Sequence, residues 1–403
     1  MDESGSKGQV AVSVFPATGP VWLDSRNIGT NGGTGVARYT QDLASCLADL
    51  GIRTAFVRSG RAGKQASSPG RLDASRRFLR ALLPCRHVHD IQDGVAGGQP
   101  CCTDLYRTAH VRFKTFGRLT SCRADTPPAL MHWTYPLPMV MEGCTNIVTI
   151  HDLVPLLNPG LTGIDPTRFA RLLRALVDRM DMVVTVSETV RTQLIDIMGV
   201  APSRIVNLYQ MVDIDVAAVM KSTRIIPPDC LLHIGRVESR KNIERLIAAY
   251  GQSGSHRPLV LVGPDGDDRP DLSLPEGAAG QVIRIPWIER LSLLRGLAEA
   301  HALVFPSLGE GFGLPIVEAM VLGTPVITSR GGAPEEIAGG AACLVDPFDI
   351  GEISTAIATL DRADRQDSMY RDLVERGHAR ARFFSRQAYT ARLKEFYARI
   401  PFR

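Results

Sequence analysis

The sequence predicts an α/β protein built from two doubly wound domains. Its 403 residues exceed what one ordinary hydrophobic core accommodates, which favours two domains. Short apolar runs alternate with helical patterns along most of the chain, as in parallel sheets whose strands are joined by helices. The alternation falls into two series of similar length that meet near residue 218. In such domains ligands gather at the carboxyl ends of the strands, so the loops there are the first places to look for a site.

The first series defines an N-terminal domain over residues 1–217. Strands are predicted at 21–24, 54–57, 146–150 and 181–186, and helices at 36–50 and 188–198. Residues 58–130 interrupt this rhythm and are rich in Arg, Gly, Ser and Pro, so we expect an irregular insertion there. Within it, residues 74–83 have the pattern of a basic amphipathic helix.

The second series defines a C-terminal domain over residues 218–385, with a linker expected at 225–228. Strands are predicted at 230–234, 259–262, 282–285, 302–305, 326–328 and 342–345, with helices between them. A last helix, at 386–399, belongs to a separate C-terminal segment, 386–403. It could pack on either domain, and the pattern alone does not decide which.

The composition is that of a soluble globular protein, with 44% hydrophobic and 22% charged residues. The eight cysteines are scattered without a CxxC pair, so neither a zinc site nor a disulfide framework is expected. The N-terminus lacks the basic segment of a signal peptide, and no apolar run approaches the roughly 18–20 residues that span a bilayer. We therefore expect a cytoplasmic protein with free thiols.

Positive charge is concentrated in residues 51–130. This segment holds 14 Lys and Arg against 5 Asp and Glu, whereas the whole chain has a net charge of only +4. Such an uneven distribution indicates an anionic partner near the basic segment. A solvated insertion would carry the same charge without a partner, so both interpretations stay open.

The most informative stretch is Ser307–Met320, SLGEGFGLPIVEAM, which joins a predicted strand to a predicted helix. Its glycines permit the backbone to come close to a ligand, and Pro315 fits the first turn of a helix. We expect Glu318 in that first turn and Glu310 in the loop before it, so that both carboxylates reach one pocket. Because carboxylates accept hydrogen bonds from hydroxyl groups, the stretch predicts a site for a hydroxyl-rich ligand that carries phosphate.

Two other loops follow predicted strands and could hold an anion. Gly29–Gly35, GTNGGTG, precedes a helix, so its amides can approach a phosphate, although a flexible turn would have the same composition. Gly235–Asn242 carries Arg236 and Lys241, which could converge on a diphosphate at a helix N-terminus. Taken alone, a basic pair in a loop is more often just solvated.

His151 follows another predicted strand, where it could contact a reacting group, although a lone histidine is more often structural. Other chemistries lack their motifs. The 29–35 loop lacks the third glycine and the strand-two acid of a dinucleotide fingerprint, which disfavours an NAD-dependent oxidoreductase. No Gly-x-Ser-x-Gly elbow supports a hydrolase, and no His-x-x-x-His spacing indicates a metal. We expect no metal ion, with Arg236 and Lys241 neutralising the phosphate instead.

Together these motifs resemble the retaining glycosyltransferases of family 4, which have the GT-B fold. The resemblance covers most of the chain and is strongest over residues 231–349. The matching segments are 150–155, 185–187, 235–242, 306–319 and 323–327. One departure is Tyr209–Asp213, YQMVD, where family members often carry Asn-Gly-Val-Asp. The resemblance implies two Rossmann-like domains facing across a cleft, with the last helix crossing back onto the N-terminal domain.

The resemblance also implies a role for each candidate residue. Arg236 and Lys241 would bind the donor diphosphate and support its departure. Glu310 would hold hydroxyls of the transferred sugar, with His151 beside that sugar, and Glu318 would hold the ribose. The remaining donor-binding positions would be Gly32, Gly33, Gly235, Gly311, Phe312, Gly313 and Leu314.

The run from Asp24 to Tyr39 is similar to that of mannosyltransferases that build bacterial surface polysaccharides, so GDP-mannose is the expected donor. A UDP-sugar donor (glucosyl, galactosyl or N-acetylglucosaminyl) stays open, as do a sugar phosphorylase, a nucleotide-sugar epimerase and a non-catalytic nucleotide-sugar sensor. We expect no cofactor and no nucleic-acid partner.

The expected acceptor is a glycan or a polyprenyl-diphosphate-linked saccharide at the cytoplasmic face of the inner membrane. The basic helix would then contact the membrane peripherally. Its arginines would meet anionic headgroups while its apolar side chains enter the interface. The side chains concerned are Arg76, Arg77, Arg80, Phe78, Leu79, Leu82 and Leu83.

Overall fold

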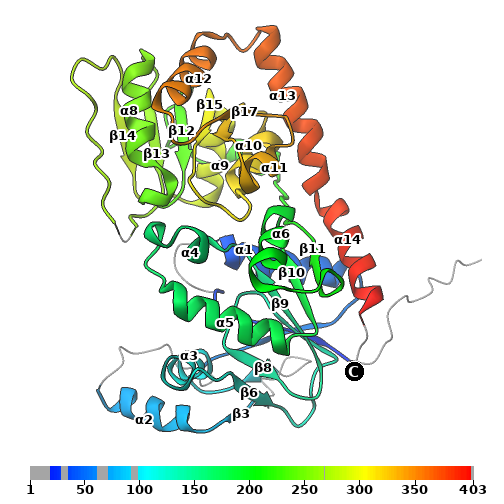
Figure 1. The fold of residues 1–403 in the computed structure, drawn as a ribbon. Coiled ribbons are helices and arrows are strands. Elements are labelled where there is room, and N and C mark those ends of the chain that lie inside the picture. Colours follow the sequence, from blue (N-terminus) through cyan, green and yellow to red (C-terminus); the bar gives the residue numbers. More distant parts are fainter. Residues whose placement is uncertain (1–18, 29–34, 61–70, 92–98, 267, 401–403) are drawn as a thin grey trace, which may run out of the picture.

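The computed structural model describes residues 19–28, 35–60, 71–91, 99–266 and 268–400, and it confirms the two doubly wound domains (Figure 1). Each domain contains a six-stranded sheet that is parallel throughout. The loop that contains Gly32 and Gly33 lies outside the described residues.

The N-terminal sheet has the strand order β11-β10-β9-β7-β1-β2. Its strands are β1 (Val21–Asp24), β2 (Thr54–Val57), β7 (Leu130–Trp133), β9 (Thr145–Ile150), β10 (Met182–Thr185) and β11 (Ile205–Asn207). Side chains alternate between the two faces of the sheet, as in any strand. Leu23 and Ile147 pack toward α1 (Gly35–Asp49), whereas Met131 and Val148 pack toward α5 (Pro166–Arg179).

The C-terminal sheet has the strand order β14-β13-β12-β15-β16-β17. Its strands are β12 (Leu231–Ile234), β13 (Leu259–Val262), β14 (Val282–Ile285), β15 (Ala302–Phe305), β16 (Val326–Ser329) and β17 (Cys343–Val345). On one face α8 (Ile243–Ser253) packs against α12 (Ile350–Arg362). On the other face lie α9 (Arg290–Glu299), α10 (Leu314–Leu322) and α11 (Gly332–Ala338).

The remaining elements connect or flank the two sheets. The α-helices are α4 (Val154–Leu157), α6 (Glu188–Met198), α7 (Val216–Lys221) and α13 (Ser368–Ala381). The 3-10 helices are η1 (Pro159–Leu161), η2 (Pro202–Arg204), η3 (Ser239–Lys241) and η4 (Arg382–Phe384). The domain boundary expected at 217 falls inside α7, which packs against α9 of the C-terminal domain.

The described parts of residues 58–130 contain more helix and strand than the composition of this segment predicts. They hold two helices, α2 (Arg71–Leu82) and α3 (Leu105–Phe116), and four short strands. β3 (Cys85–His87), β6 (Thr120–Arg123) and the later β8 (Met139–Met141) form a parallel sheet, and β4 (His89–Ile91) pairs with β5 (Gln99–Cys101). Strands of three or four residues are too short to show a hydrophobic period, which is why the sequence did not reveal them.

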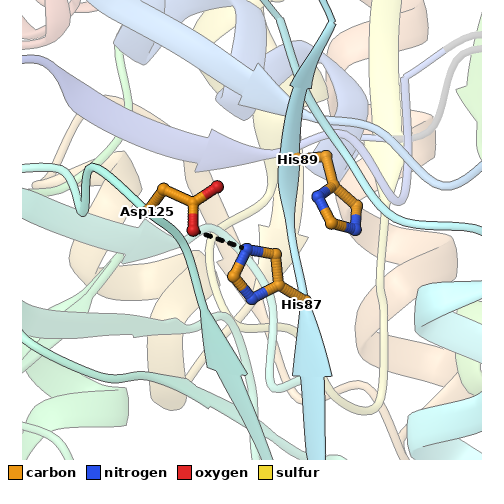
Figure 2. A group of neighbouring side chains, drawn as sticks. All are labelled: His87, His89 and Asp125. Atoms are coloured by element: carbon orange, nitrogen blue, oxygen red, sulfur yellow. Dashed lines mark ion pairs between the residues drawn. The ribbon is translucent and has the colours of Figure 1, made fainter.

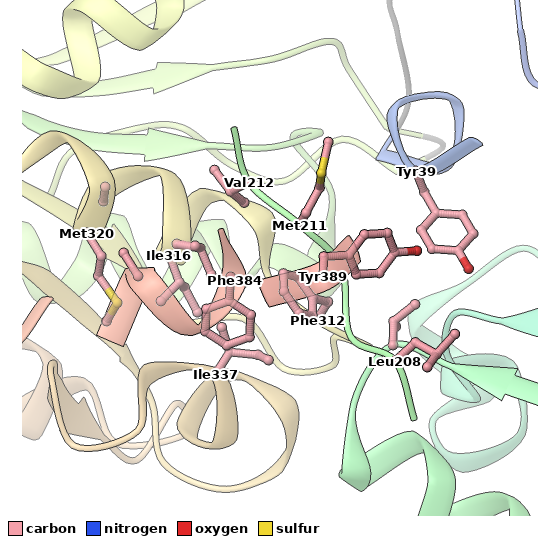
Figure 3. Close-up of a cluster of buried hydrophobic side chains, with 14 of the residues drawn as sticks. Tyr39, Leu208, Met211, Val212, Phe312, Ile316, Met320, Ile337, Phe384 and Tyr389 are labelled. Atoms are coloured by element: carbon pink, nitrogen blue, oxygen red, sulfur yellow. The ribbon is translucent and has the colours of Figure 1, made fainter. Parts of the chain in front are cut away.

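The two domains share one hydrophobic joint (Figure 3). Tyr39 enters it from the N-terminal domain, and Phe312 and Ile316 enter from the C-terminal domain. Phe384, from the C-terminal segment, meets Phe312 edge-on with 5.4 Å between ring centroids. Burial of this apolar surface stabilises the contact between the domains.

The last helix, α14 (Arg386–Arg399), crosses back onto the N-terminal domain (Figure 1). Its Tyr397 hydroxyl lies 2.9 Å from Nδ1 of His132 on β7, and Arg386 forms a 2.7 Å ion pair with Asp49 of α1. The structure therefore confirms the arrangement that the family resemblance implies.

Candidate functional site

The two C-terminal loops that carry the predicted donor residues meet at the carboxyl ends of adjacent strands, β12 and β15. Backbone and side-chain hydrogen bonds hold the loops together. The Leu308 amide donates to the Arg240 carbonyl at 2.9 Å, and the Asn242 side-chain amide donates to the Pro306 carbonyl at 3.0 Å. The prediction that these segments form one site therefore agrees with their placement.

Glu310 is the centre of a buried ion-pair cluster. Its Oε1 accepts from Nζ of Lys241, and its Oε2 lies 3.4 Å from Nη1 of Arg240. The side chains of Glu310 and Lys241 are 10% and 9% exposed. Gly235 leaves room for this arrangement, since a Cβ there would come within 3.1 Å of Lys241 Cε.

Burial and pairing act in opposite directions on this cluster. Burial raises the pKa of Glu310, but Lys241 and Arg240 more than offset it and hold the pKa below its usual value. Burial lowers the pKa of Lys241 despite the attraction of Glu310. Glu310 is therefore an ionised carboxylate at neutral pH, able to accept hydrogen bonds but not to donate a proton.

Arg240, and not the predicted Arg236, belongs to the ion-pair cluster of Glu310. Arg236 is exposed and donates to the Asp265 carbonyl at 3.3 Å. Arg240 bonds both Glu310 and Glu238, and Glu310 raises its pKa most strongly. Sequence reasoning missed Arg240, although it lies beside Lys241 in the same motif.

Glu318 lies one turn further along its helix than expected. Gly313 takes a left-handed conformation, with φ of 95°, so α10 begins at Leu314 and Glu318 is in its second turn. The Glu318 carboxylate is buried and pairs with Arg290 at the start of α9. Arg290 was not predicted, although its place just beyond the carboxyl end of β14 was a usable signal.

His151 lies on the N-terminal side of the cleft and is neutral. Its Nε2 donates to the Thr134 carbonyl at 2.8 Å, and its ring meets Tyr39 edge-on at 5.0 Å. Burial lowers its pKa to about 4 despite that hydrogen bond. Because the carbonyl only accepts, Nε2 carries the proton and Nδ1 is left as an acceptor.

Asp24 supports this residue from behind. Its Oδ2 accepts from the Thr134 amide at 2.5 Å and from the Thr134 hydroxyl at 2.8 Å. Burial raises the pKa of Asp24 to about 6, although those hydrogen bonds oppose the change. Asp24 therefore fixes Thr134, the residue whose carbonyl orients His151.

The loop glycines contact protein across the cleft. A side chain at Gly311 would overlap the His151 carbonyl, and one at Gly309 would press on Val154 at 3.2 Å. Gly35, at the start of α1, faces Leu314. We expected the glycines to let a ligand come close to the backbone. In this structure they let the opposite domain come close to it. The side chain of Phe312 belongs to the hydrophobic joint.

A cleft of about 430 Å³ adjoins Glu310 on the side away from Lys241. Its walls come from both domains. They include Asn158, Thr189, Gln193, Gly309, Arg330 and Asp346. The lining is mixed polar and apolar, which suits a hydroxyl-rich molecule.

Solved structures of other proteins share this architecture. Sucrose-phosphate synthase from Thermosynechococcus elongatus matches with a TM-score of 0.64 at 19% identity, covering 94% of this chain and 98% of that one. A trehalose-phosphate synthase from Burkholderia vietnamiensis matches with a TM-score of 0.57 at 11% identity, covering 94% and 100%. At such identities the likeness establishes the fold, and the fold is GT-B.

Two family models match the chain in turn. One, described as Glycosyltransferase Family 4, matches residues 33–216, and the other, Glycosyl transferases group 1, matches residues 228–362. Fold and site thus define a glycosyltransferase. The chain carries a glycosyltransferase family 4 domain followed by a glycosyl transferases group 1 domain.

Named relatives are found in bacteria. An O-antigen chain mannosyltransferase B of Escherichia coli is 28% identical over 87% of this chain and 92% of its own length. A serotype-specific mannosyltransferase of the same organism is 28% identical over 63% of this chain, which spans about a third (33%) of that protein. A D-inositol 3-phosphate glycosyltransferase of a Mycobacterium species is 29% identical over 57% of this chain and 54% of its own length.

Proposed function

We propose that this glycosyltransferase moves a mannosyl group from GDP-mannose to a saccharide acceptor, with retention of anomeric configuration. The observation that carries the proposal is the buried cluster of Glu310, Lys241 and Arg240 at the cleft. Such a cluster places a carboxylate for sugar hydroxyls directly beside cations for a departing diphosphate.

The diphosphate is the leaving group, and its developing charge sets the barrier. Lys241 and the exposed Arg236 would neutralise it, and the N-terminus of α10 would add its dipole. No metal ion is needed in this scheme. Glu318, held by Arg290, would accept hydrogen bonds from the ribose hydroxyls.

Glu310 would bind hydroxyls on the far side of the transferred sugar and leave the anomeric carbon free. The acceptor oxygen would then attack from the leaving-group face. Its bond to the anomeric carbon forms as the bond to the diphosphate oxygen breaks, and the acceptor proton passes to that oxygen. Nδ1 of neutral His151 would accept a hydrogen bond from the same sugar.

The choice of mannose rests on the relatives. Those whose names specify the sugar and which cover most of this chain are mannosyltransferases. The competing donor is a UDP-sugar, since several solved neighbours are named as UDP-forming or as complexes with UDP. A phosphorylase of the same fold would need inorganic phosphate for turnover. An epimerase of the same fold would convert the nucleotide sugar without an acceptor.

A panel of GDP, UDP, ADP and their sugars, scored by the shift in melting temperature, tests the donor. We expect GDP and GDP-mannose to stabilise the protein most, because a ligand that binds the folded state raises its stability. Lys241→Ala should lose the shift, whereas Lys221→Ala, an exposed lysine on α7, should keep it. Stabilisation by UDP alone would overturn the choice of GDP, and NMR of the glycoside product would decide retention.

We further propose that α2 brings the enzyme to an anionic membrane surface, where a lipid-linked acceptor would lie. In the described part of the chain, no helix combines the length and hydropathy needed to span a bilayer. Instead α2 leaves four large apolar side chains in solvent, between 46% and 62% exposed. They are Phe78, Leu79, Leu82 and Leu83.

The same helix is fixed to the domain on its other side. Arg112 donates to the carbonyls of Ala81, Leu82 and Leu83, and Arg77 forms a 2.6 Å ion pair with Asp104. The expectation that Arg77 is free for headgroups is therefore corrected. Arg76 is exposed and Arg80 is half-buried beside the apolar side chains, so they are the cations available to headgroups.

Flotation with vesicles that contain anionic lipid tests this proposal. We expect binding that weakens with salt and is lost in Leu79→Ser/Leu83→Ser, whereas Met369→Ser on α13, another exposed apolar residue, keeps it. Absence of binding by the unaltered protein would remove the membrane proposal without affecting the donor proposal.

A further inference from the structure

We propose that His87, His89 and Asp125 form a binding site for a divalent transition metal, with Zn²⁺ as its expected occupant. The three side chains gather on the N-terminal domain, far along the chain from every residue assigned to sugar transfer (Figure 2). Each offers one ligand atom, and these atoms all lie within 4.8 Å of one another.

The fold brings the three residues together for local reasons. Val88 is buried, at 1% exposure, so its neighbours His87 and His89 both face solvent. The Val88 amide donates to the Arg123 carbonyl at 2.7 Å, which sets the register between β3 and β6. That register pairs His87 with Arg123, and Asp125, two residues further along the chain, comes within reach of the His87 ring.

The geometry is close to that of a metal site. His87 Nε2 lies 3.2 Å from Asp125 Oδ1. Zinc bonds of about 2.0–2.1 Å at a tetrahedral angle place neighbouring ligand atoms about 3.3 Å apart. The two histidine rings lie 4.5 Å apart between centroids, and both side chains are exposed, so a rotamer change of His89 completes the set.

The donor set selects the class of metal. Two imidazoles and one carboxylate suit zinc, copper or nickel, whereas magnesium prefers oxygen ligands. Three protein ligands leave the fourth position to water. The ion would tie the β3–β4 segment to the chain after β6, and it would stabilise the subdomain that carries α2.

The usual metal-binding spacings did not indicate this site, because the ligands are an i, i+2 pair and a residue from the bend that follows β6. The His-x-His pair was the available signal. The expectation of no metal ion concerned the phosphate of the donor, and the proposed metal site shares no residue with the donor site.

Metal titration of the tag-free protein tests the proposal. We expect one equivalent of Zn²⁺ to bind and to raise the melting temperature by several degrees, while Mg²⁺ at the same concentration does neither. His87→Ala and His89→Ala should each abolish the stoichiometric binding and the shift. His256→Ala, another exposed histidine, should leave both unchanged.

Co²⁺ distinguishes this site from the cysteines. Binding without a thiolate charge-transfer band, lost in His87→Ala, would support the imidazole site. Binding that persists in the His87→Ala/His89→Ala double variant, or no stoichiometric binding by the unaltered protein, would overturn the proposal. Because the readouts are binding and melting, a failed glycosyltransferase assay has no bearing on the result.

Discussion

The two faces of the cleft treat charge in opposite ways. On the C-terminal face Glu310, Lys241 and Arg240 are buried as ions, each beside a partner of opposite sign. On the N-terminal face burial moves His151 and Asp24 toward their neutral forms, with pKa values of about 4 and 6. Hydrogen bonds through Thr134 connect these two residues.

The difference reflects the cost of removing ions from water. An unpaired buried ion costs several kcal/mol, so a protein either neutralises it or supplies a partner. The C-terminal face supplies partners and thereby keeps cations ready for a phosphate. The N-terminal face presents neutral His151, whose ring can donate and accept hydrogen bonds, which suits a sugar. The cations thus lie on the half of the cleft where the leaving group is expected.

The largest effect should follow from breaking the charged face. Glu310→Ala leaves Lys241 and Arg240 without their shared carboxylate, and breaking a buried pair costs about 3–5 kcal/mol of unfolding free energy. We also expect turnover to fall by roughly 10²-fold or more, as when a group that stabilises the transition state is removed. Urea denaturation and steady-state kinetics measure the two quantities.

The double variant Glu310→Ala/Lys241→Ala separates stability from catalysis. It should recover part of the lost stability, because no buried cation remains opposite the missing carboxylate, but it should recover no turnover. Recovery of neither would show that the pair does not govern stability. Near-normal turnover in the single variants would remove Glu310 and Lys241 from the reaction.

The pH dependence of the unfolding free energy tests the raised pKa of Asp24 on the N-terminal face. Asp24 has its folded pKa raised to about 6, so its contribution is present at low pH and is lost as the pH rises through 6. At about 1.4 kcal/mol per pKa unit, the change approaches 3 kcal/mol between pH 4 and pH 7. Asp24→Asn removes this term, so the unfolding free energy of the variant should rise more steeply with pH over that range.

The buried histidines act with the opposite sign. Burial lowers the pKa values of His132, His151 and His233 to about 3, 4 and 4. Their contribution is therefore present above pH 6.5 and is lost as the pH falls toward 4. Asp196→Asn, at an exposed position, should keep the slope of the unaltered protein. Equal slopes in Asp24→Asn and the unaltered protein would contradict the assignment of Asp24.

A smaller loss is expected at His151, which contributes a hydrogen bond rather than a charge. His151→Ala should lower turnover about fivefold, since a neutral hydrogen bond is worth about 1 kcal/mol and about 1.4 kcal/mol corresponds to a factor of ten. Because His151 stays neutral between pH 5 and 8, the variant and the unaltered enzyme should have pH–rate profiles of the same shape over this range. A drop as large as that of Glu310→Ala would mean that the two faces do not differ as described.

Much of the fold could be predicted because its signals are local. The helices 188–198 and 386–399 were predicted at their observed bounds, and each follows a serine whose hydroxyl caps the first turn. β11 was missed because it has three residues, too few for a period. β7 was missed because it begins at residue 130, where the composition of 58–130 favoured an irregular insertion, and α3 was missed for that reason too.

Site residues could be predicted only where the residue types of their own loop indicate ligand binding. The family resemblance implied that Glu310 and Lys241 contact one donor, and the structure pairs their side chains. Glu310 and Glu318 were expected to reach one pocket, but of the two only Glu310 lines the cleft. Arg290 was missed because its partner, Glu318, lies 28 residues away on another helix. The crossing of Gly311 past the His151 carbonyl depends on how the domains meet, which no local pattern encodes.

The smallest predicted effect concerns the contact that holds the two faces together away from the hydrophobic joint. Glu336 on α11 accepts from the amides of Glu188 and Thr189 at 2.7 and 2.8 Å, so a C-terminal-domain carboxylate caps the N-terminus of α6. The Thr189 hydroxyl adds a bond of 2.7 Å. Loss of such a cap costs about 1 kcal/mol.

Glu336→Ala should therefore weaken the closure of the two domains while leaving the side chains of both faces in place. We expect a few-fold rise in the KM for the donor with a smaller change in kcat, and a larger radius of gyration in solution scattering without ligand. Glu375→Ala, at an exposed position on α13, should change none of these. If Glu336→Ala lowers kcat as strongly as Glu310→Ala does, then closure itself assembles the charged face, and the two faces do not act as separate preformed halves.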